Sequence, residues 1–143
     1  MLSKNIKKTA EVSKVFLNRI LKDTKQKGAL VVALSGDLGA GKTAFTQTFG
    51  KHLGIKNKMS SPTFVLIKKY PIKLKDYKYF FHLDAYRLKN EKELLHLGWD
   101  EIIKDKEHIV FIEWPENVAK AIPRGAKRVK VTTNKEGHRK FKY

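Results

Sequence analysis

Residues 36–43 read Gly36-Asp37-Leu38-Gly39-Ala40-Gly41-Lys42-Thr43 and match the pattern G-x-x-x-x-G-K-[S/T] at every fixed position. Glycines let a loop turn tightly and bring successive backbone N–H groups against phosphate oxygens. The lysine of this pattern reaches the β- and γ-phosphates of a nucleotide, and the hydroxyl of the last residue ligates Mg²⁺. The stretch therefore predicts a binding site for a nucleoside triphosphate.

The sequence on either side of this loop agrees with that interpretation. Residues 29–34 form a continuous apolar run, as expected for a strand that is buried on both faces. After the loop, Phe45, Phe49 and Leu53 recur at spacings of four, which predicts a helix over 43–53. Strand, glycine loop and helix are the context in which the motif binds phosphate. A glycine turn without a ligand is the alternative reading of the same residues.

Length and composition predict one domain over residues 1–143. A chain of this length buries enough of its surface on folding to form an ordinary hydrophobic core. The chain has no cysteine, so disulfides and thiolate metal sites are excluded. No apolar stretch approaches the ~20 residues that span a bilayer, and the first residues lack the apolar region of a secretion signal. We therefore expect a soluble, cytoplasmic protein without a membrane partner.

The formal net charge is +17, from 31 basic and 14 acidic residues. Such an excess can attract tRNA, another nucleic acid or an acidic protein. Most of the basic residues are lysines spread along the chain, so a generic solvated surface is the simpler interpretation. The densest basic stretch, residues 124–143, contains Phe141 and Tyr143 and is compatible with an edge that contacts RNA directly.

The hydrophobic pattern predicts an α/β fold, a P-loop NTPase-like three-layer sandwich. Its central sheet is expected to be mixed, with parallel core strands and antiparallel edge strands. Thr9 is expected to N-cap a helix that ends near residues 27–28, with an apolar face formed by Val12, Val15, Phe16, Ile20 and Leu21.

Further along the chain, residues 63–70 and 77–84 read as two antiparallel strands, the second half-exposed because its apolar residues alternate. A short helix is expected over 91–97. Residues 109–113 are apolar until the final carboxylate and are placed beside the strand that precedes the loop. Pro115 is expected to open a short helix, and 129–132 with 138–143 to form a terminal hairpin.

Two carboxylates are candidates for the chemistry of hydrolysis, because such residues usually follow strands adjoining the phosphate loop. Glu113 ends a buried run and can ligate Mg²⁺ directly or through water; a carboxylate at the start of the next helix is the alternative. Asp84 ends the preceding strand and can position water or hold the outer shell of the metal. Its alternative role is that of an N-cap or turn residue.

Other polar residues carry weaker signals. Thr63 follows Ser60-Ser61-Pro62, in the place of a nucleotide-sensing switch segment, and its hydroxyl is a candidate sensor of the γ-phosphate. Arg87 reads as a surface ion pair or as an arginine that approaches phosphate. Residues 134–137 lack the aspartate of the guanine-reading N-K-x-D motif, so we expect ATP rather than GTP. His82 reads as structural, and Trp99 and Trp114 as core or partner-contact residues.

Taken together, the chain resembles the TsaE (YjeE) family of bacterial ATPases, which are needed for threonylcarbamoyladenosine synthesis on tRNA. The resemblance covers roughly residues 9–116, in the order of the family. Its most specific segments are Ser61-Pro62-Thr63-Phe64, His82-Leu83-Asp84-Ala85-Tyr86-Arg87 and Ile112-Glu113-Trp114, and Gly98-Trp99 also matches.

The resemblance implies a small ATPase that joins the TsaB–TsaD pair, with ATP and Mg²⁺ as its cofactors and tRNA as an indirect partner. Thr43 and Glu113 would ligate Mg²⁺, while Lys42, Glu113, Asp84 and the switch residue Thr63 would serve hydrolysis. Thr9 and Arg139, the latter in the family's distal glycine–arginine segment, would lie near the nucleotide. The loop would hold it through Asp37, Leu38, Gly39, Ala40, Gly41, Lys42, Thr43 and Ala44.

Two other functions remain open at this point. A small-molecule P-loop kinase would share the loop, but it would need a lid and a substrate-binding insertion for which a short chain offers little room. An ATP-gated interaction module would bind the nucleotide without hydrolysing it.

Overall fold

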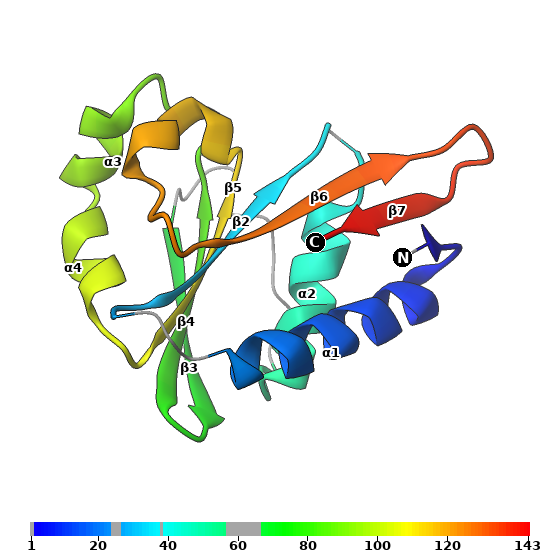
Figure 1. Cartoon of the computed structure of the whole chain (residues 1–143), viewed down its shortest axis with the longest axis horizontal. Coiled ribbons are helices and arrows are strands. Elements are labelled where there is room, and N and C mark those ends of the chain that lie inside the picture. The colour runs from blue at the N-terminus through cyan, green and yellow to red at the C-terminus, as the bar shows by residue number, and fades with distance from the viewer. Residues whose placement is uncertain (1, 24–26, 38, 57–66) are drawn as a thin grey trace.

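The computed structural model describes residues 2–23, 27–37, 39–56 and 67–143, and three layers are seen in its fold (Figure 1). The elements in chain order are β1 Leu2–Ser3, α1 Ile6–Lys22, β2 Leu30–Ser35, α2 Lys42–His52, β3 Ile67–Leu74, β4 Tyr77–Asp84, α3 Glu91–His96, α4 Trp99–Lys104, β5 His108–Glu113, the 3₁₀ helix η1 Pro115–Ala121, β6 Lys127–Thr133 and β7 Arg139–Lys142.

The described strands form one sheet in the order β1-β7-β6-β2-β5-β4-β3. The central strands β6, β2, β5 and β4 pair in parallel. The outer pairs β1–β7, β6–β7 and β3–β4 are antiparallel. This arrangement confirms the predicted α/β fold with its mixed sheet, and β5 lies beside β2 as expected.

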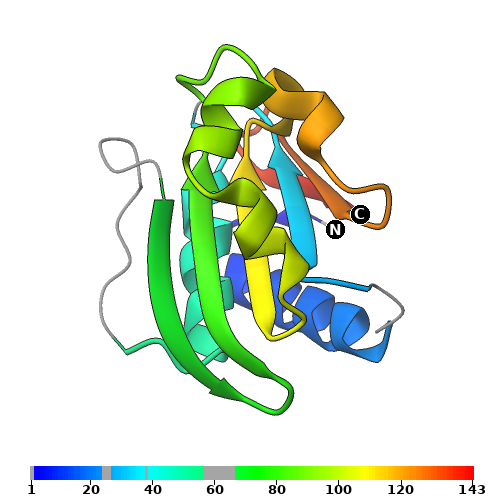
Figure 2. The same cartoon turned by 90° about the vertical axis from the view of Figure 1, so that its left-hand side faces the viewer.

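Each face of the sheet carries its own hydrophobic core. Helices α1 and α2 cover one face, while α3, α4 and η1 cover the other, as the view in Figure 2 shows. Side chains of a strand alternate between the two faces. In β2, therefore, Leu30, Val32 and Leu34 pack towards α1 and α2, while Val31 and Ala33 pack towards the other layer. The expected burial of this strand on both faces is confirmed.

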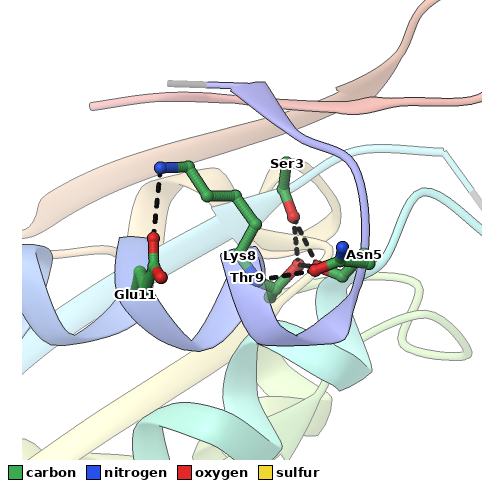
Figure 3. Close-up of polar contacts among 5 residues, drawn as sticks. All are labelled: Ser3, Asn5, Lys8, Thr9 and Glu11. Carbon is green, nitrogen blue, oxygen red and sulfur yellow. Dashed lines mark hydrogen bonds and ion pairs between the residues drawn. The ribbon is translucent and has the colours of Figure 1, made fainter.

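Helix α1 begins earlier and ends earlier than the sequence predicted. Its N-cap is Asn5, whose side-chain oxygen accepts a hydrogen bond from the backbone N–H of Lys8 at 2.9 Å. Thr9 lies inside the first turns, fully buried against β1 (Figure 3). The helix ends at Lys22, and Val15 is 47% exposed rather than part of the apolar face. The shift follows from Asn5, which is as good an N-cap as threonine.

The expected strand over 77–84 is present, but it is not half-exposed. Both faces of β4 are covered by helices: Phe80 packs in the core beneath α1 and α2, and Leu83 in the core beneath α3, α4 and η1. β3 begins at Ile67 among the described residues, and positions 63–66 of the expected strand lie outside them. The short elements β1 and α4 were not predicted, because two and six residues are too few to show a hydrophobic period.

The other expected helices and the terminal hairpin are confirmed. α2 and α3 occupy the predicted segments, Pro115 opens η1, and β6 and β7 form the terminal hairpin. In the described part of the chain, no helix has the length and apolar character needed to cross a membrane.

Candidate functional site

The loop over 36–43 connects the carboxyl end of β2 to the amino end of α2. Within it, the N–H of Ala40 donates to the carbonyl of Asp37 at 3.0 Å, and the N–H of Phe45 closes the first helical turn on Gly41 at 3.0 Å. The earliest N–H groups of a helix have no partner inside the helix, and its amino end carries partial positive charge. An eleven-residue helix that begins at this loop therefore offers an anion site.

Two glycines of the loop are required by geometry as well as by conformation. Gly41 has φ +103°, and a Cβ added there would lie 2.4 Å from Cδ of Arg139. Gly36 has φ +145°, and its Cβ would lie 2.4 Å from the carbonyl oxygen of Val131. The β6–β7 hairpin thus packs directly on the loop, and Arg139 crosses over Gly41.

The side chain of Lys42 is buried and contacts the phosphate loop itself and a neighbouring aromatic ring. Its Nζ donates a hydrogen bond to the carbonyl of Gly36 and lies 3.8 Å from the ring centroid of Trp114. Burial lowers the pKa of Lys42, and the Glu113 carboxylate is the strongest of the acidic groups that oppose this shift. An ammonium group with one hydrogen bond and an aromatic face is ready to exchange those contacts for phosphate oxygens.

Asp84 and Glu113 face each other at the carboxyl ends of β4 and β5, where they are register partners. Oδ1 of Asp84 accepts the backbone N–H of Tyr86 at 2.9 Å. Oε2 of Glu113 lies 2.6 Å from Nε2 of the buried His82. Burial raises the pKa of Asp84, and the neighbouring Glu113 carboxylate raises it further, against the opposing hydrogen bond from Tyr86.

These groups surround a cavity of about 460 Å³. Most of the residues that the sequence singled out line it, namely Gly39, Gly41, Lys42, Thr43, Ala44, Asp84, Glu113 and Arg139. The structure therefore brings the phosphate loop, both candidate carboxylates and the distal arginine to one place. Their roles towards a ligand remain predictions.

Other predicted residues lie elsewhere. Asp37 is exposed, Ala40 is buried in the core, and neither lines the cavity. The hydroxyl of Thr9 lies 2.6 Å from that of Ser3 and 3.2 Å from the carbonyl of Asn5, which joins α1 to β1 (Figure 3). Leu38 and Thr63 lie outside the described residues.

Three lining residues were not predicted at the site: Gln47, Tyr86 and Trp114. Trp114 was expected in the core or at a partner contact; it does pack on the core, but its ring also covers Lys42 and lies 5.0 Å from the ring of Tyr86. A signal for each was present in the sequence. Gln47 is one helical turn after Thr43. Trp114 directly follows the strand that ends in Glu113, and Tyr86 lies two residues after Asp84.

The donor set of the cavity suits Mg²⁺. Thr43 contributes a hydroxyl and Glu113 a carboxylate, the hard oxygen donors that Mg²⁺ prefers. Over the described ranges, no cluster of three or more acidic, histidine or cysteine side chains could hold a metal alone. Mg²⁺ usually keeps several waters and shares one or two protein ligands with substrate phosphates, so this sparse set fits a cation that arrives with a nucleotide.

Comparisons with known proteins place these features in a family. A family model described as threonylcarbamoyl adenosine biosynthesis protein TsaE matches residues 3–141. A protein of Bacillus subtilis strain 168, named tRNA threonylcarbamoyladenosine biosynthesis protein TsaE, is 36% identical over 107 residues, which are 75% of this chain and 63% of that protein. The protein of the same name in Streptomyces coelicolor is 35% identical over 80% of this chain and 76% of its own length.

A solved structure agrees with the fold. The crystal structure of YdiB from Bacillus subtilis superposes with a TM-score of 0.70 at 26% sequence identity. The match covers 99% of this chain and 80% of that chain.

Proposed function

The chain belongs to the TsaE family, and on that premise we propose that it is an Mg²⁺-dependent ATPase that serves threonylcarbamoyladenosine formation in tRNA. It would act with the TsaB–TsaD pair in the cytoplasm, where its tRNA substrate is modified. The chain spans less than two thirds of the Bacillus subtilis relative, so activity and partners belong to the proposal. The convergence of Lys42, Thr43, Asp84 and Glu113 on one cavity is the observation that carries it.

Each group has a role that its chemistry supports. The N–H groups of the loop and of the first turn of α2 bind phosphate oxygens. Lys42 leaves the Gly36 carbonyl and the Trp114 ring to neutralise the β- and γ-phosphates. Thr43 and Glu113 would hold Mg²⁺, which, when bound, supplies positive charge at the phosphate oxygens.

Asp84 is the group best placed to orient water. It lies beside Glu113 at the end of β4. Its raised pKa lies closer to neutral pH, where a carboxylate is a more effective general base. Thr63, outside the described residues, remains our predicted switch residue. We expect slow hydrolysis by the isolated chain, as the family resemblance implies, and expect nucleotide binding to replace the contacts of Lys42 with Gly36 and Trp114.

The decisive experiment is reconstitution with TsaB, TsaD, tRNA and threonylcarbamoyl-adenylate, with γ-labelled ATP as the probe. Phosphate release supports the ATPase, transfer of label to a small acceptor supports a kinase, and retention of intact ATP supports a non-hydrolysing module. We expect Lys42→Ala and Glu113→Ala to abolish multiple-turnover modification. Lys92→Ala, an exposed lysine of α3, is the matched control and is expected to leave it unchanged.

Undiminished multiple-turnover modification by Lys42→Ala or Glu113→Ala would overturn the mechanism. Binding of ATP without any release of phosphate in the complete assembly would overturn the ATPase assignment.

A further inference from the structure

The β6–β7 hairpin presents different chemistry on its two faces. Val129, Val131 and Phe141 are buried in the core beneath α1 and α2. Side chains alternate along a strand, so the sequence neighbours of these buried residues point to the opposite face, where they are exposed. This basic face consists of Arg128, Lys130, Lys140 and Lys142.

Among the described residues, no helical layer covers the basic face. The core beneath α3, α4 and η1 draws its sheet residues from β2, β4 and β5, with Ile67 of β3 packed against it, and none from β6 or β7. Figure 1 shows the hairpin reaching away from α3 and α4, with α1 and α2 on its other side. Helices therefore cover both faces of the sheet at its centre but only one face at the hairpin.

The charges on this face oppose one another. Lys130 of β6 is the register partner of Lys142 of β7, and Lys140 is the partner of Thr132. Like charges directly opposite each other destabilise an antiparallel pair. Among the ion pairs formed between described residues, none involves Lys130, Lys140 or Lys142. The fold thus holds the ammonium groups of Lys130, Lys140 and Lys142 on one face without an acidic side chain of the described chain to pair with them.

We propose that this basic face binds the phosphate backbone of RNA. A polyanion removes the repulsion between the lysines, and each lysine–phosphate contact releases condensed counterions. The face has no exposed aromatic side chain, and Leu2, opposite Lys140 at its edge, is its exposed large apolar residue. Contacts of this kind fix a nucleic acid in place without reading its sequence.

An acidic protein is the weaker candidate for this face. Cores of protein interfaces are depleted in lysine and are anchored by aromatic or apolar residues, which the face lacks apart from Leu2. The choice of RNA among polyanions rests on the proposed function. Direct RNA contact by this subunit goes beyond that function, which requires tRNA only as the substrate of the assembly.

The test is fluorescence anisotropy with a labelled tRNA transcript, using the isolated chain without ATP or partners and several potassium chloride concentrations. The test variant replaces Lys130, Lys140 and Lys142 by glutamine. The control variant replaces Lys73, Lys75 and Lys106, which are exposed around the far ends of β3 and β5, and changes the net charge equally.

We expect the test variant to lose on the order of 100-fold in affinity at ~0.1 M salt. The slope of log affinity against log salt concentration should become shallower by about 2, because each of the three lost contacts contributes about 0.7. The control variant should bind nearly as the unmodified chain does. The thermal unfolding midpoint of the test variant should not fall, because a repulsive pair has been removed.

Equal losses in both variants would overturn the inference, since net charge rather than this face would then drive binding. Unchanged binding by the test variant, or no binding by the unmodified chain, would overturn it as well. In a separate pull-down with TsaB–TsaD, loss of partner binding by the test variant with RNA affinity retained would assign the face to a protein and overturn the inference too. None of these results bears on hydrolysis, which is measured separately with labelled ATP.

Discussion

Nε2 of His82 and Oε2 of Glu113 lie 2.6 Å apart and join β4 to β5 beneath the candidate site. Both side chains are almost fully buried. His82 and Asp84 are two residues apart and therefore share a face of β4, the face that packs towards α2 through Phe80. The apolar stripe of that face turns polar at the carboxyl end of the strand, and the imidazole there orients a predicted Mg²⁺ ligand.

Loss of this contact should weaken Mg²⁺ dependence. We expect His82→Ala to raise the Mg²⁺ concentration for half-maximal ATP hydrolysis by about 10- to 100-fold, as for other groups that orient metal ligands. His82→Gln should be milder, because its amide nitrogen can still donate to Glu113. Mg²⁺ titration of the partner-stimulated ATPase measures both effects.

The exposed His96→Gln is the control for that experiment and should behave as the unmodified chain. Thermal unfolding separates misfolding from misorientation. If His82→Ala lost activity without any shift in Mg²⁺ dependence, the role given to His82 would be wrong.

Asp84→Asn should trade activity for stability. The amide keeps an oxygen for the N–H of Tyr86 but removes a buried charge beside Glu113. We expect a higher unfolding midpoint at neutral pH and a loss of hydrolysis of about 100-fold or more. Asp100→Asn, on the exposed side of α4, should change neither. A lower unfolding midpoint for Asp84→Asn would contradict the destabilising effect assigned to this buried charge.

The same carboxylate gives stability a pH dependence of known sign. The folded-state pKa of Asp84 is raised above its ordinary value of 3.8, so the folded chain binds this proton more tightly than the unfolded chain. The stabilisation is complete below the unfolded-state pKa and is lost as pH rises through the raised folded-state pKa. Across that window, urea unfolding should show a smaller pH-dependent loss of stability in Asp84→Asn than in the unmodified chain.

Trp114 should report nucleotide binding by its fluorescence. Phosphate draws Lys42 away from the indole ring, which changes the surroundings of the ring. The other tryptophan, Trp99, is buried and donates its N–H to the carbonyl of Ala121, away from the cavity lining. We expect ATP to change the emission of the unmodified chain, and to leave Trp114→Phe, which retains Trp99, unaffected. An equal response from that variant would place the signal elsewhere.

Gly41→Ala and Gly54→Ala form a matched pair. Both glycines have positive φ, so each alanine should cost about 1–2 kcal/mol of stability. Only at Gly41 does the new Cβ meet Arg139; at Gly54 nothing lies within 4 Å. Calorimetric titration with ATP should therefore show lost affinity for Gly41→Ala and unchanged affinity for Gly54→Ala. The affinity cost of Gly41→Ala should be smaller when it is measured against Arg139→Ala alone; an undiminished cost in that background would show that steric conflict with Arg139 is not the cause.

The parallel centre of the sheet and its phosphate loop were predictable because the local pattern is unambiguous. A continuous apolar run, a glycine loop and a helical spacing follow one another over residues 29–53. Glu113 and Asp84 could be placed at the site because strands that pair in parallel end at the same edge of a sheet.

Other features depend on contacts that no local pattern records. Asn5 and Thr9 are both acceptable N-caps, and burial of Thr9 against Ser3 decides between them. The covered state of β4 depends on helices α3 and α4, which pack on it from later in the chain. Nor could spacing reveal that Trp114 shields Lys42, because that contact depends on how the chain leaves β5, with Trp114 at φ +58°.

The position of Arg139 at the start of β7 has a consequence for the spacing of the two proposed sites. Arg139 touches Gly41 of the phosphate loop, while its neighbour Lys140 belongs to the outward row of lysines. Successive residues of a strand point to opposite sides but share one backbone. A single short strand thus carries one residue to the phosphate loop and the next to the basic face, so the proposed nucleotide and RNA sites are one residue apart.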